Sequence, residues 1–392
     1  MANNKSNGFI SKAERISRKS NRLSKGTIIK RILLSFFTVI LCLIIALYTC
    51  LFILVNSECQ PLRDRLVLSA MQASATKWLP YLFLPGETVE SIVEASYIVN
   101  TDVMSLDEYK MLTADQEAKV EDIWSNAVDG MIFETIHGSN FKGYVLIVKD
   151  PSRVFVGTSS DFTKGLKGMT IFDMAKKENA VAIINAGEFS DPGGQGDGNN
   201  PLGITYSKGS CVWNDSFKRT FIGFDKNNKL IVTEPMTKKQ AQELEIRDGV
   251  SFQNGNTLIT NRDGSISIHY SDSNTGTAQR TAIGQRADGS VILLVTDGRS
   301  ASSIGATKNY VIDVMVKYGA ITAGMLDGGS SSLMYYEDYF TKFGYDTEKL
   351  DQYQLRGLVN KYKAFTTPRR MPTYFCVAKL ENESEAMTDE QY

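Results

Sequence analysis

The sequence VILLVTDG at residues 291–298 is matched by ITAGMLDG at residues 321–328. Each is a short apolar run that ends in an Asp-Gly pair, which is the pattern of a buried strand leading into a turn. Residues 306–318 between them carry apolar side chains at helical spacing, and Gly319 follows as a helix stop. Strands joined by such a crossover usually run parallel, so the stretch predicts a parallel βαβ unit. Asp297 and Asp327 should then lie at the same edge of one sheet and face one cleft.

The flanking sequence predicts further strands and helices around this unit. Residues 144–148 and 154–156 resemble a hairpin, and a second hairpin is expected at residues 221–232. Residues 169–179 have a helical pattern, and the buried strand expected at 180–184 would place Asn185 and Glu188 just beyond its end. The predicted fold class is therefore α+β, with a mixed β-sheet core and flanking helices over residues 131–380.

The N-terminal region has the pattern of a membrane anchor. Residues 1–31 hold nine Lys or Arg residues and one Glu, and the 24 residues from Ile32 to Val55 carry no charge. About 20 apolar residues suffice to cross a bilayer, and a basic flank keeps its side cytoplasmic. The sequence therefore predicts a cytoplasmic tail (1–31), a single transmembrane signal anchor (32–55), a helical stalk or linker (56–130) and an extracytoplasmic C-terminal domain. The acidic end, residues 381–392, is expected to be disordered.

Composition excludes several classes of protein. The 392 residues have a formal net charge of −1, and the basic excess lies in the N-terminal tail, where it suits membrane topology better than nucleic-acid binding. Five cysteines, two of them in the apolar segment, do not form a disulfide framework, and two histidines do not suggest a zinc centre. A bridge between Cys211 and Cys376 and two free thiols are both compatible with the sequence.

Several motifs, taken together and in order, resemble those of a known family. They are INAGEF at 184–189, a Gly-rich loop ending in PLG at 201–203, RTAIG at 280–284, TDGR at 296–299, LDGGSS at 326–331 and RRMPT at 369–373. This set resembles the phosphodiester glycosidases related to N-acetylglucosamine-1-phosphodiester α-N-acetylglucosaminidase, over residues 143–379. Glu188 departs from the family pattern, which commonly has a small residue at that position.

The resemblance implies hydrolysis of a sugar joined through its anomeric carbon to a phosphodiester, here in a surface or secreted glycan. Such a reaction needs a carboxylate near the oxocarbenium-like sugar and cationic or N–H donors near the phosphate. The catalytic candidates are Asp297, Asp327 and Glu188, with the acid/base assignment and the stereochemical outcome left open. The substrate-binding candidates are Asn185, Arg280, Arg299, Gly328, Gly329 and Ser330, in which the arginines would bind phosphate.

Other interpretations of these residues remain possible at this point. Asp297 and Asp327 could be turn formers, Asn185 could cap a turn, and the arginines could pair with the aspartates. Asp191, Asp197 and Asn199 in the Gly-rich loop resemble part of a calcium loop without its regular spacing, so no cofactor is expected beyond a possible divalent cation. The main functional alternative is a non-catalytic phosphoglycan-binding module anchored to the membrane, and a third is a structural factor with a vestigial cleft.

Overall fold

The computed structural model describes residues 25–55, 60–71, 76–95, 99–110, 124–138, 141–159, 162, 166–192, 196–271, 276–298, 303–362 and 367–380. The chain divides into two compact units, Met1–Cys59 and Gln60–Tyr392. The acidic end at 381–392 and the basic residues 1–24 lie outside the described residues.

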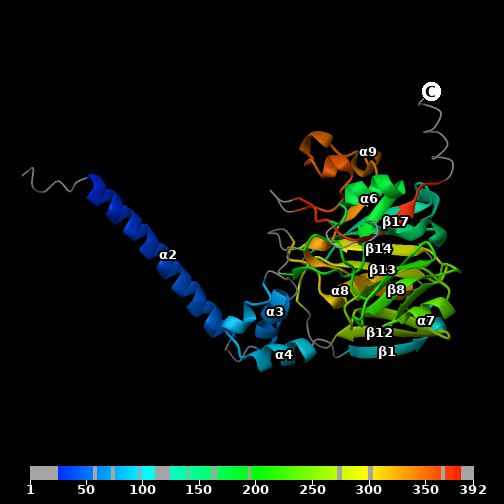
Figure 1. Ribbon diagram of the computed structural model, residues 1–392, viewed down its shortest axis with the longest axis horizontal. Coiled ribbons are helices and arrows are strands. Elements are labelled where there is room, and N and C mark those ends of the chain that lie inside the picture. The colour runs from blue at the N-terminus through cyan, green and yellow to red at the C-terminus, as the bar shows by residue number, and fades with distance from the viewer. Residues whose placement is uncertain are drawn as a thin grey trace, which may run out of the picture. The chain divides into compact units, whose positions relative to one another are not determined.

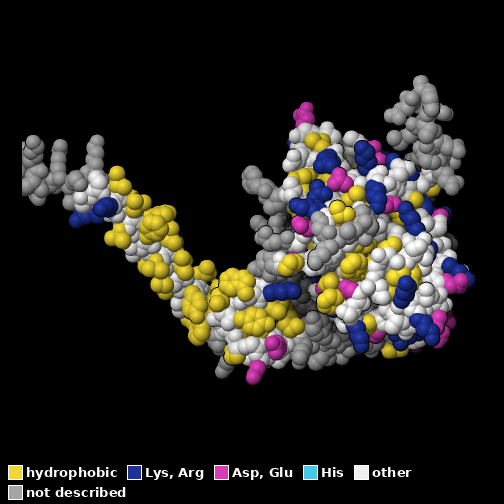
Figure 2. All heavy atoms as spheres, in the orientation of Figure 1, with side chains coloured by type: hydrophobic (Ala, Val, Ile, Leu, Met, Phe, Trp, Pro, Cys, Tyr) yellow, Lys and Arg dark blue, Asp and Glu magenta, His cyan; other side chains and the backbone are white. Residues whose placement is uncertain are grey.

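The first unit contains one long helix, α2 (Lys25–Val55). Within it, Gly26–Ile53 is the one stretch in the described part of the chain that is long and apolar enough to cross a membrane. Figure 2 shows its side chains as an almost continuous hydrophobic surface. Because a secretory signal passes the same test of length and composition, α2 is compatible with either a membrane anchor or a signal sequence.

The second unit is built on three β-sheets (Figure 1). The eight-stranded sheet has the order β1 (Val99–Ser105), β12 (Ser265–Ser271), β11 (Thr257–Arg262), β15 (Ala320–Leu326), β13 (Thr281–Arg286), β14 (Val291–Thr296), β3 (Lys142–Val148), β2 (Met131–His137). The five-stranded sheet has the order β7 (Ser210–Asn214), β6 (Ile204–Ser207), β10 (Ile246–Phe252), β8 (Thr220–Asp225), β9 (Leu230–Thr233). The four-stranded sheet has the order β16 (Met334–Tyr336), β5 (Ala180–Asn185), β17 (Thr373–Ala378), β4 (Val154–Thr158).

The helices of this unit are short. The α-helices are α3 (Gln60–Met71), α4 (Gly86–Ala95), α6 (Ile171–Glu178), α7 (Lys238–Glu243), α8 (Lys308–Lys317) and α9 (Tyr339–Lys342). The 3-10 helices are η1 (Pro80–Leu82), η2 (Trp124–Asn126), η3 (Pro151–Arg153), η5 (Gly329–Ser331), η6 (Thr347–Lys349) and η7 (Gln354–Arg356). Thr170 and Thr307 cap α6 and α8 by accepting hydrogen bonds from Asp173 N–H and Tyr310 N–H, which fixes where these two helices begin.

One hydrophobic core joins the three sheets. Leu293 of the eight-stranded sheet, Ile222 of the five-stranded sheet and Ile184 of the four-stranded sheet belong to the same buried cluster. The helix α8 contributes Met315 to this cluster, and α6 packs in a second cluster against β5 and β17. The strands at the centre of these sheets are therefore fully buried, as their nearly continuous apolar sequences predicted.

The prediction of an α+β fold is confirmed, but the mixed β-sheet core and the parallel βαβ unit are wrong. Every strand pair that the structure describes is antiparallel, and β13 is inserted between β14 and β15. Because both strands pair antiparallel with β13, they still run in the same direction, and Asp297 and Asp327 still leave the sheet at the same edge. The insertion separates the two strands by two spacings, about 9.6 Å.

Two local predictions also need correction. The strands β3 and β4 do not form a hairpin, because η3 turns the chain out of the eight-stranded sheet and β4 pairs with β17 in the four-stranded sheet. Within the residues expected to form a helical stalk, β1 pairs along its whole length with β12. The hairpin of β8 and β9, the helices α6 and α8, and the strands β5, β14 and β15 lie where the sequence predicted them.

Candidate functional site

The two Asp-Gly turns lie on either side of the segment that leads into β13. The N–H of Gly329 donates to the carbonyl of Gln279 at 2.9 Å. A Cβ atom on Gly298 would lie 2.8 Å from the Gln279 backbone nitrogen, and one on Gly328 would lie 3.0 Å from the Gln279 carbonyl oxygen. Close packing against this backbone therefore requires glycine after each aspartate. It also fixes both turns at one edge of the sheet.

Asp327 follows β15 directly and is partly buried. Its backbone N–H donates to Ala186 O at 3.0 Å, and its carbonyl accepts from Nδ2 of Asn185 at 2.6 Å. Both contacts come from the end of β5, so the four-stranded sheet positions a residue carried by the eight-stranded sheet. The Asp327 carboxyl group is thus held at a junction between sheets.

The surroundings of Asp327 give its carboxyl group an unusual pKa. Burial raises the pKa of Asp327 to about 7, and the negative charges of Glu188 and Asp191 also raise it, against a hydrogen bond from Ser331 and the charge of Arg369, which lower it. A carboxyl group that titrates near neutrality can accept or donate a proton at physiological pH, which is the property that acid–base catalysis needs.

The charged groups beside Asp327 form two ion pairs. Oε2 of Glu188 lies 2.6 Å from Nε of Arg219, and Oδ1 of Asp191 lies 2.7 Å from Nη2 of Arg369. The Arg369 guanidinium is therefore paired with the Asp191 carboxylate. Burial raises the pKa of Asp191, but its contact with Arg369 outweighs this effect and holds that pKa below its usual value.

Asp297 lies in a different environment at the same edge. Its Oδ2 accepts a hydrogen bond from the Tyr144 hydroxyl at 2.9 Å, and the backbone N–H of Lys361 also donates to this carboxyl group. Burial raises the pKa of Asp297, while the Tyr144 hydrogen bond, Lys142 and Lys361 lower it. The carboxylates adjacent to Asp327 are Glu188 and Asp191.

A short stretch of chain connects the two aspartates along the rim. Asp297 interacts with the backbone of Lys361, and the hydroxyl of the next residue, Tyr362, donates to Ser330 O at 3.3 Å. The hydroxyl of Ser330 in turn accepts from Nη1 of Arg369 at 3.3 Å. These contacts connect the surroundings of Asp297 and Asp327 along one rim.

The predicted phosphate-binding arginines are placed differently. Arg280 is 4% exposed, and its guanidinium donates to two backbone carbonyls, Ala306 O at 3.1 Å and Gly276 O at 2.5 Å. This arrangement holds the segment that precedes β13 against the segment that follows β14. Arg299 lies outside the described residues, so its role in phosphate binding stays a prediction.

The turn formed by Gly328, Gly329 and Ser330 uses much of its own hydrogen-bonding capacity. It continues as the three-residue helix η5, in which Ser331 N–H donates to Gly328 O and Ser332 N–H donates to Gly329 O, both at 3.2 Å. Gly329 has a φ of 64°, a conformation that favours glycine. With the Gly329 N–H also directed at Gln279, the turn presents fewer N–H donors to an anion than its sequence suggested.

Asn185 is fully buried and its side chain links three segments. In addition to its donation to Asp327 O, its Oδ1 accepts from the Thr281 hydroxyl at 2.8 Å and from Leu333 N–H at 3.1 Å. Because these contacts occupy the amide, Asn185 has the geometry of a residue that positions Asp327. A direct contact between this amide and a sugar hydroxyl stays a prediction.

We expect Asn185→Ala to lower the free energy of unfolding by about 3 kcal/mol, since it leaves buried donors and an acceptor without partners. Chemical denaturation of the full chain in detergent measures this change. Asn227→Ala, in the exposed β8–β9 turn, is the matched control and should change stability by less than about 0.5 kcal/mol. Equal effects for the two variants would show that the Asn185 contacts do not stabilise the fold.

Arg369 and its partner Asp191 are the site residues that the sequence-based candidates omitted. Arg369 belongs to the RRMPT motif, and the order of motifs was the signal that could have identified it. Asp191 was considered only as a possible calcium ligand, whereas its Oδ1 contacts Arg369 and accepts from Gly196 N–H at 2.6 Å. Within the described ranges, no group of three His, Cys, Asp or Glu side chains is placed to hold a metal ion.

The cysteines do not contribute to the site. Cys211 and Cys376 both have free thiols, and Cys376 is buried in the second hydrophobic cluster, between α6 and β17. Burial raises the pKa of the Cys376 thiol, so this group is an unreactive packing residue.

Comparison with known sequences gives a family match. The family model described as phosphodiester glycosidase matches residues 178–378, which include β5, Asp191, both Asp-Gly turns and Arg369. A curated relative, the SPbeta prophage-derived uncharacterized protein YomE of Bacillus subtilis (strain 168), is 27% identical over 210 residues. This alignment covers 47% of the present chain and 27% of YomE, so the chain matches about a quarter of that relative's length.

Solved structures with a similar chain course have low sequence identity. The zebrafish N-acetylglucosamine-1-phosphodiester α-N-acetylglucosaminidase catalytic domain, auto-inhibited by its pro-peptide, is 18% identical with a TM-score of 0.47, covering 72% of this chain and 88% of that one. A putative exported protein from Burkholderia pseudomallei is 13% identical with a TM-score of 0.41, covering 74% and 88% of the two chains.

Proposed function

Because the chain belongs to the phosphodiester glycosidase family, we propose that it is a hydrolase that releases a sugar from a glycosyl-1-phosphodiester. The observation that carries this proposal is the Asp327 carboxyl group, whose pKa of about 7 arises beside the Arg369 guanidinium. The Asp327 carboxyl group can transfer a proton at neutral pH, and the Arg369 guanidinium can bind phosphate.

In the proposed reaction, Asp327 acts as the general base. It takes a proton from a water molecule as the water oxygen forms a bond to the anomeric carbon. The bond between the anomeric carbon and the phosphate oxygen breaks, and its electron pair remains on the phosphate oxygen. The products are a free sugar and a phosphomonoester. A phosphate leaving group needs little protonation, so a base is more valuable here than an acid.

The other residues act on charge and position. The guanidinium of Arg369, whose charge acts on Asp327, would bind the phosphate through charge-assisted hydrogen bonds. The Glu188 carboxylate, held by Arg219, would stabilise the positive charge that develops on the sugar. The Asp297 carboxylate would accept a hydrogen bond from a sugar hydroxyl, and Arg280 would support the site by holding Gly276 and Ala306.

We further propose that α2 anchors the chain in a membrane with its N-terminus cytoplasmic and with residues 60–392 outside. The length and apolar composition of α2 support anchoring, and the basic residues that precede it support this orientation. The substrate would then be a phosphate-containing glycan of the cell surface or a secreted glycan.

A turnover assay tests the proposed function. The full chain, purified in detergent, is given a synthetic N-acetylglucosamine-1-phosphodiester, and the release of reducing sugar and of phosphomonoester is followed at pH 7.5. Equal release of the two products, in proportion to enzyme, is expected. Binding of the substrate without release of either product would instead identify a phosphoglycan-binding module.

A further inference from the structure

A polar surface lies on the eight-stranded sheet away from the Asp-Gly turns. Thr260 of β11 is paired with Ser267 of β12, and Arg262 and His269 lie two residues along the same strands, so all four occupy one face. The alternating residues Ile266 and Ile268 lie on the opposite face and are buried in the main core. This end of the sheet therefore has one apolar face and one face of hydroxyl, guanidinium and imidazole groups.

The five-stranded sheet covers only part of this polar face. Over β15 the two sheets touch, since a Cβ atom on Gly324 would lie 3.0 Å from Ile222 and 3.2 Å from Val232. Beyond β15, over β11 and β12, the sheets separate and leave a pocket of about 360 Å³. Pockets for small ligands measure about 300–1,000 Å³, so this volume accommodates a sugar unit with a phosphate.

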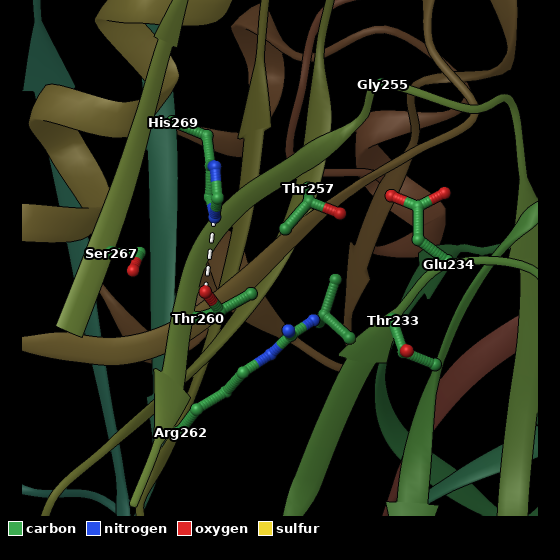
Figure 3. Close-up of a pocket in the computed structure, with 9 residues that line it drawn as sticks. Thr233, Glu234, Gly255, Thr257, Thr260, Arg262, Ser267 and His269 are labelled. Carbon is green, nitrogen blue, oxygen red and sulfur yellow. Dashed lines mark hydrogen bonds between the residues drawn. The ribbon is translucent and has the colours of Figure 1, made fainter. Parts of the chain in front are cut away.

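The pocket has two chemically different sides (Figure 3). The Arg262 side chain extends from β11 toward β9, whereas the Glu234 carboxylate lies on another side, near Gly255. The Thr257 side chain lies between them, and the Thr260 hydroxyl lies beside His269. Guanidinium binds phosphate through two parallel N–H donors, and carboxylate and hydroxyl oxygens accept hydrogen bonds from sugar hydroxyls.

Lys308 is a second cationic group beside the pocket. Lys308 at the start of α8 donates from Nζ to Gly255 O at 2.7 Å, and Gly255 lines the pocket. Nε2 of His269 is 3.1 Å from the Thr260 hydroxyl, and burial together with Lys308 and Arg262 lowers the pKa of His269. The floor thus favours an anion that is accompanied by hydroxyl groups.

The pocket begins close to the catalytic edge. Thr257 is paired with Gly324, three residues before Asp327, and Met325 N–H donates to Asn256 O at 2.9 Å. At about 3.3 Å per residue, Asp327 lies about 10 Å beyond Thr257 along the strand direction, and Arg262 about 17 Å from Thr257 in the opposite direction. The pocket therefore extends away from the catalytic edge over a distance longer than one sugar.

We propose that this pocket is a second glycan subsite, which binds a further phosphate-bearing sugar unit of the chain being cleaved. Arg262 would bind its phosphate, and Glu234 with the threonine hydroxyls would bind its sugar hydroxyls. This proposal rests on the proposed function and adds to it a preference for polymeric substrates. Asp327 would act on one glycosyl phosphate while the pocket holds another along the same polymer.

Two non-hydrolysable probes test the subsite, a glycosyl phosphonate of one unit and a chain of three units. Calorimetry with the full chain in detergent should give a lower Kd for the three-unit probe. Arg262→Gln should raise the Kd of the three-unit probe about tenfold and leave that of the one-unit probe unchanged. Arg65→Gln, on the exposed surface of α3 and outside the pocket, is the matched control and should change neither.

Several results would overturn the subsite. Two of them are equal binding of the two probes and no binding of either probe. The third is an unchanged Kd of the three-unit probe in Arg262→Gln, which would mean that the polar face of β11 and β12 is only solvated. The hydrolysis assay separates this failure from failure of the proposed function. Release of sugar with no dependence on chain length rejects the subsite alone, whereas Arg262-dependent binding without release rejects the hydrolase and retains the glycan site.

Discussion

Asp327→Asn is expected to lower kcat/KM for a glycosyl-1-phosphodiester by at least about 100-fold, because an amide cannot take a proton from the attacking water. The backbone contacts of Asp327 with Ala186 and Asn185 do not involve the carboxyl group and should keep the turn in place. The rate of sugar release by the full chain, at substrate concentrations far below KM, measures the effect. Thermal unfolding of the same preparation shows whether the variant is folded.

The pH dependence gives a second and independent readout. With Asp327 as a base whose pKa is about 7, kcat/KM should rise with pH below 7 and level off above it. Because the negative charge of Glu188 raises the pKa of Asp327, Glu188→Gln should move this limb of the profile to lower pH. A lower plateau without a shifted limb would mean that Glu188 does not influence the group that titrates.

Asp263→Asn provides the control for Asp327→Asn. Asp263 is exposed in the β11–β12 turn and has a φ of 51°, which asparagine adopts as readily as aspartate. Its activity should stay within twofold of the unchanged chain. A folded Asp327→Asn variant with activity near that of this control would remove Asp327 from the mechanism.

The same residue also makes stability depend on pH. The folded-state pKa of about 7 lies above the ordinary value of 3.8, so the folded chain holds a proton that the unfolded chain releases. This group therefore contributes a loss of stability as pH rises from about 4 to about 7. Such a cost is typical of a residue kept for chemistry, since the fold itself would be more stable without it.

The sequence predicted the two Asp-Gly turns correctly because the signal there is local. Apolar runs, helix caps and glycine positions are read over a few residues, and β14, α8 and β15 appear where those patterns end. Strand order is set by pairing between distant segments, and the pattern of residues 291–328 gives no sign that β13 is inserted between β14 and β15. The direction of the strands could therefore be predicted, but the spacing between the aspartates could not.

The arginine that lies beside Asp327 likewise could not be predicted from the sequence. Arg280 precedes β13 in a motif, which made it a reasonable phosphate ligand, but its side chain turns toward Gly276 O and Ala306 O. Arg369 precedes the strand β17 of another sheet, and only the assembly of the three sheets brings it beside Asp191 and Asp327. A long side chain has several possible partners within reach, so its contact follows from tertiary structure.

Arg369→Gln is expected to lower kcat/KM by about 100-fold or more, because it removes the charge and the N–H donors proposed to bind the phosphate. Arg369→Lys keeps the charge but loses the planar fork, and its activity should lie between those of Arg369→Gln and the unchanged chain. Because kcat/KM alone would not distinguish an effect on substrate binding from one on turnover, kcat and KM are measured separately for each variant.

The neighbouring residue supplies a matched control. The Arg370 side chain is 49% exposed and pairs with Asp173 at 3.9 Å, so Arg370→Gln removes an equal charge outside the site and should change kcat/KM less than twofold. The charge of Arg369 lowers the pKa of Asp327, so Arg369→Gln should also move the limb of the pH profile to higher pH. If a folded Arg369→Gln variant kept both the rate and the pH profile of Arg370→Gln, Arg369 would have no part in binding phosphate, and its ion pair with Asp191 would serve only the fold.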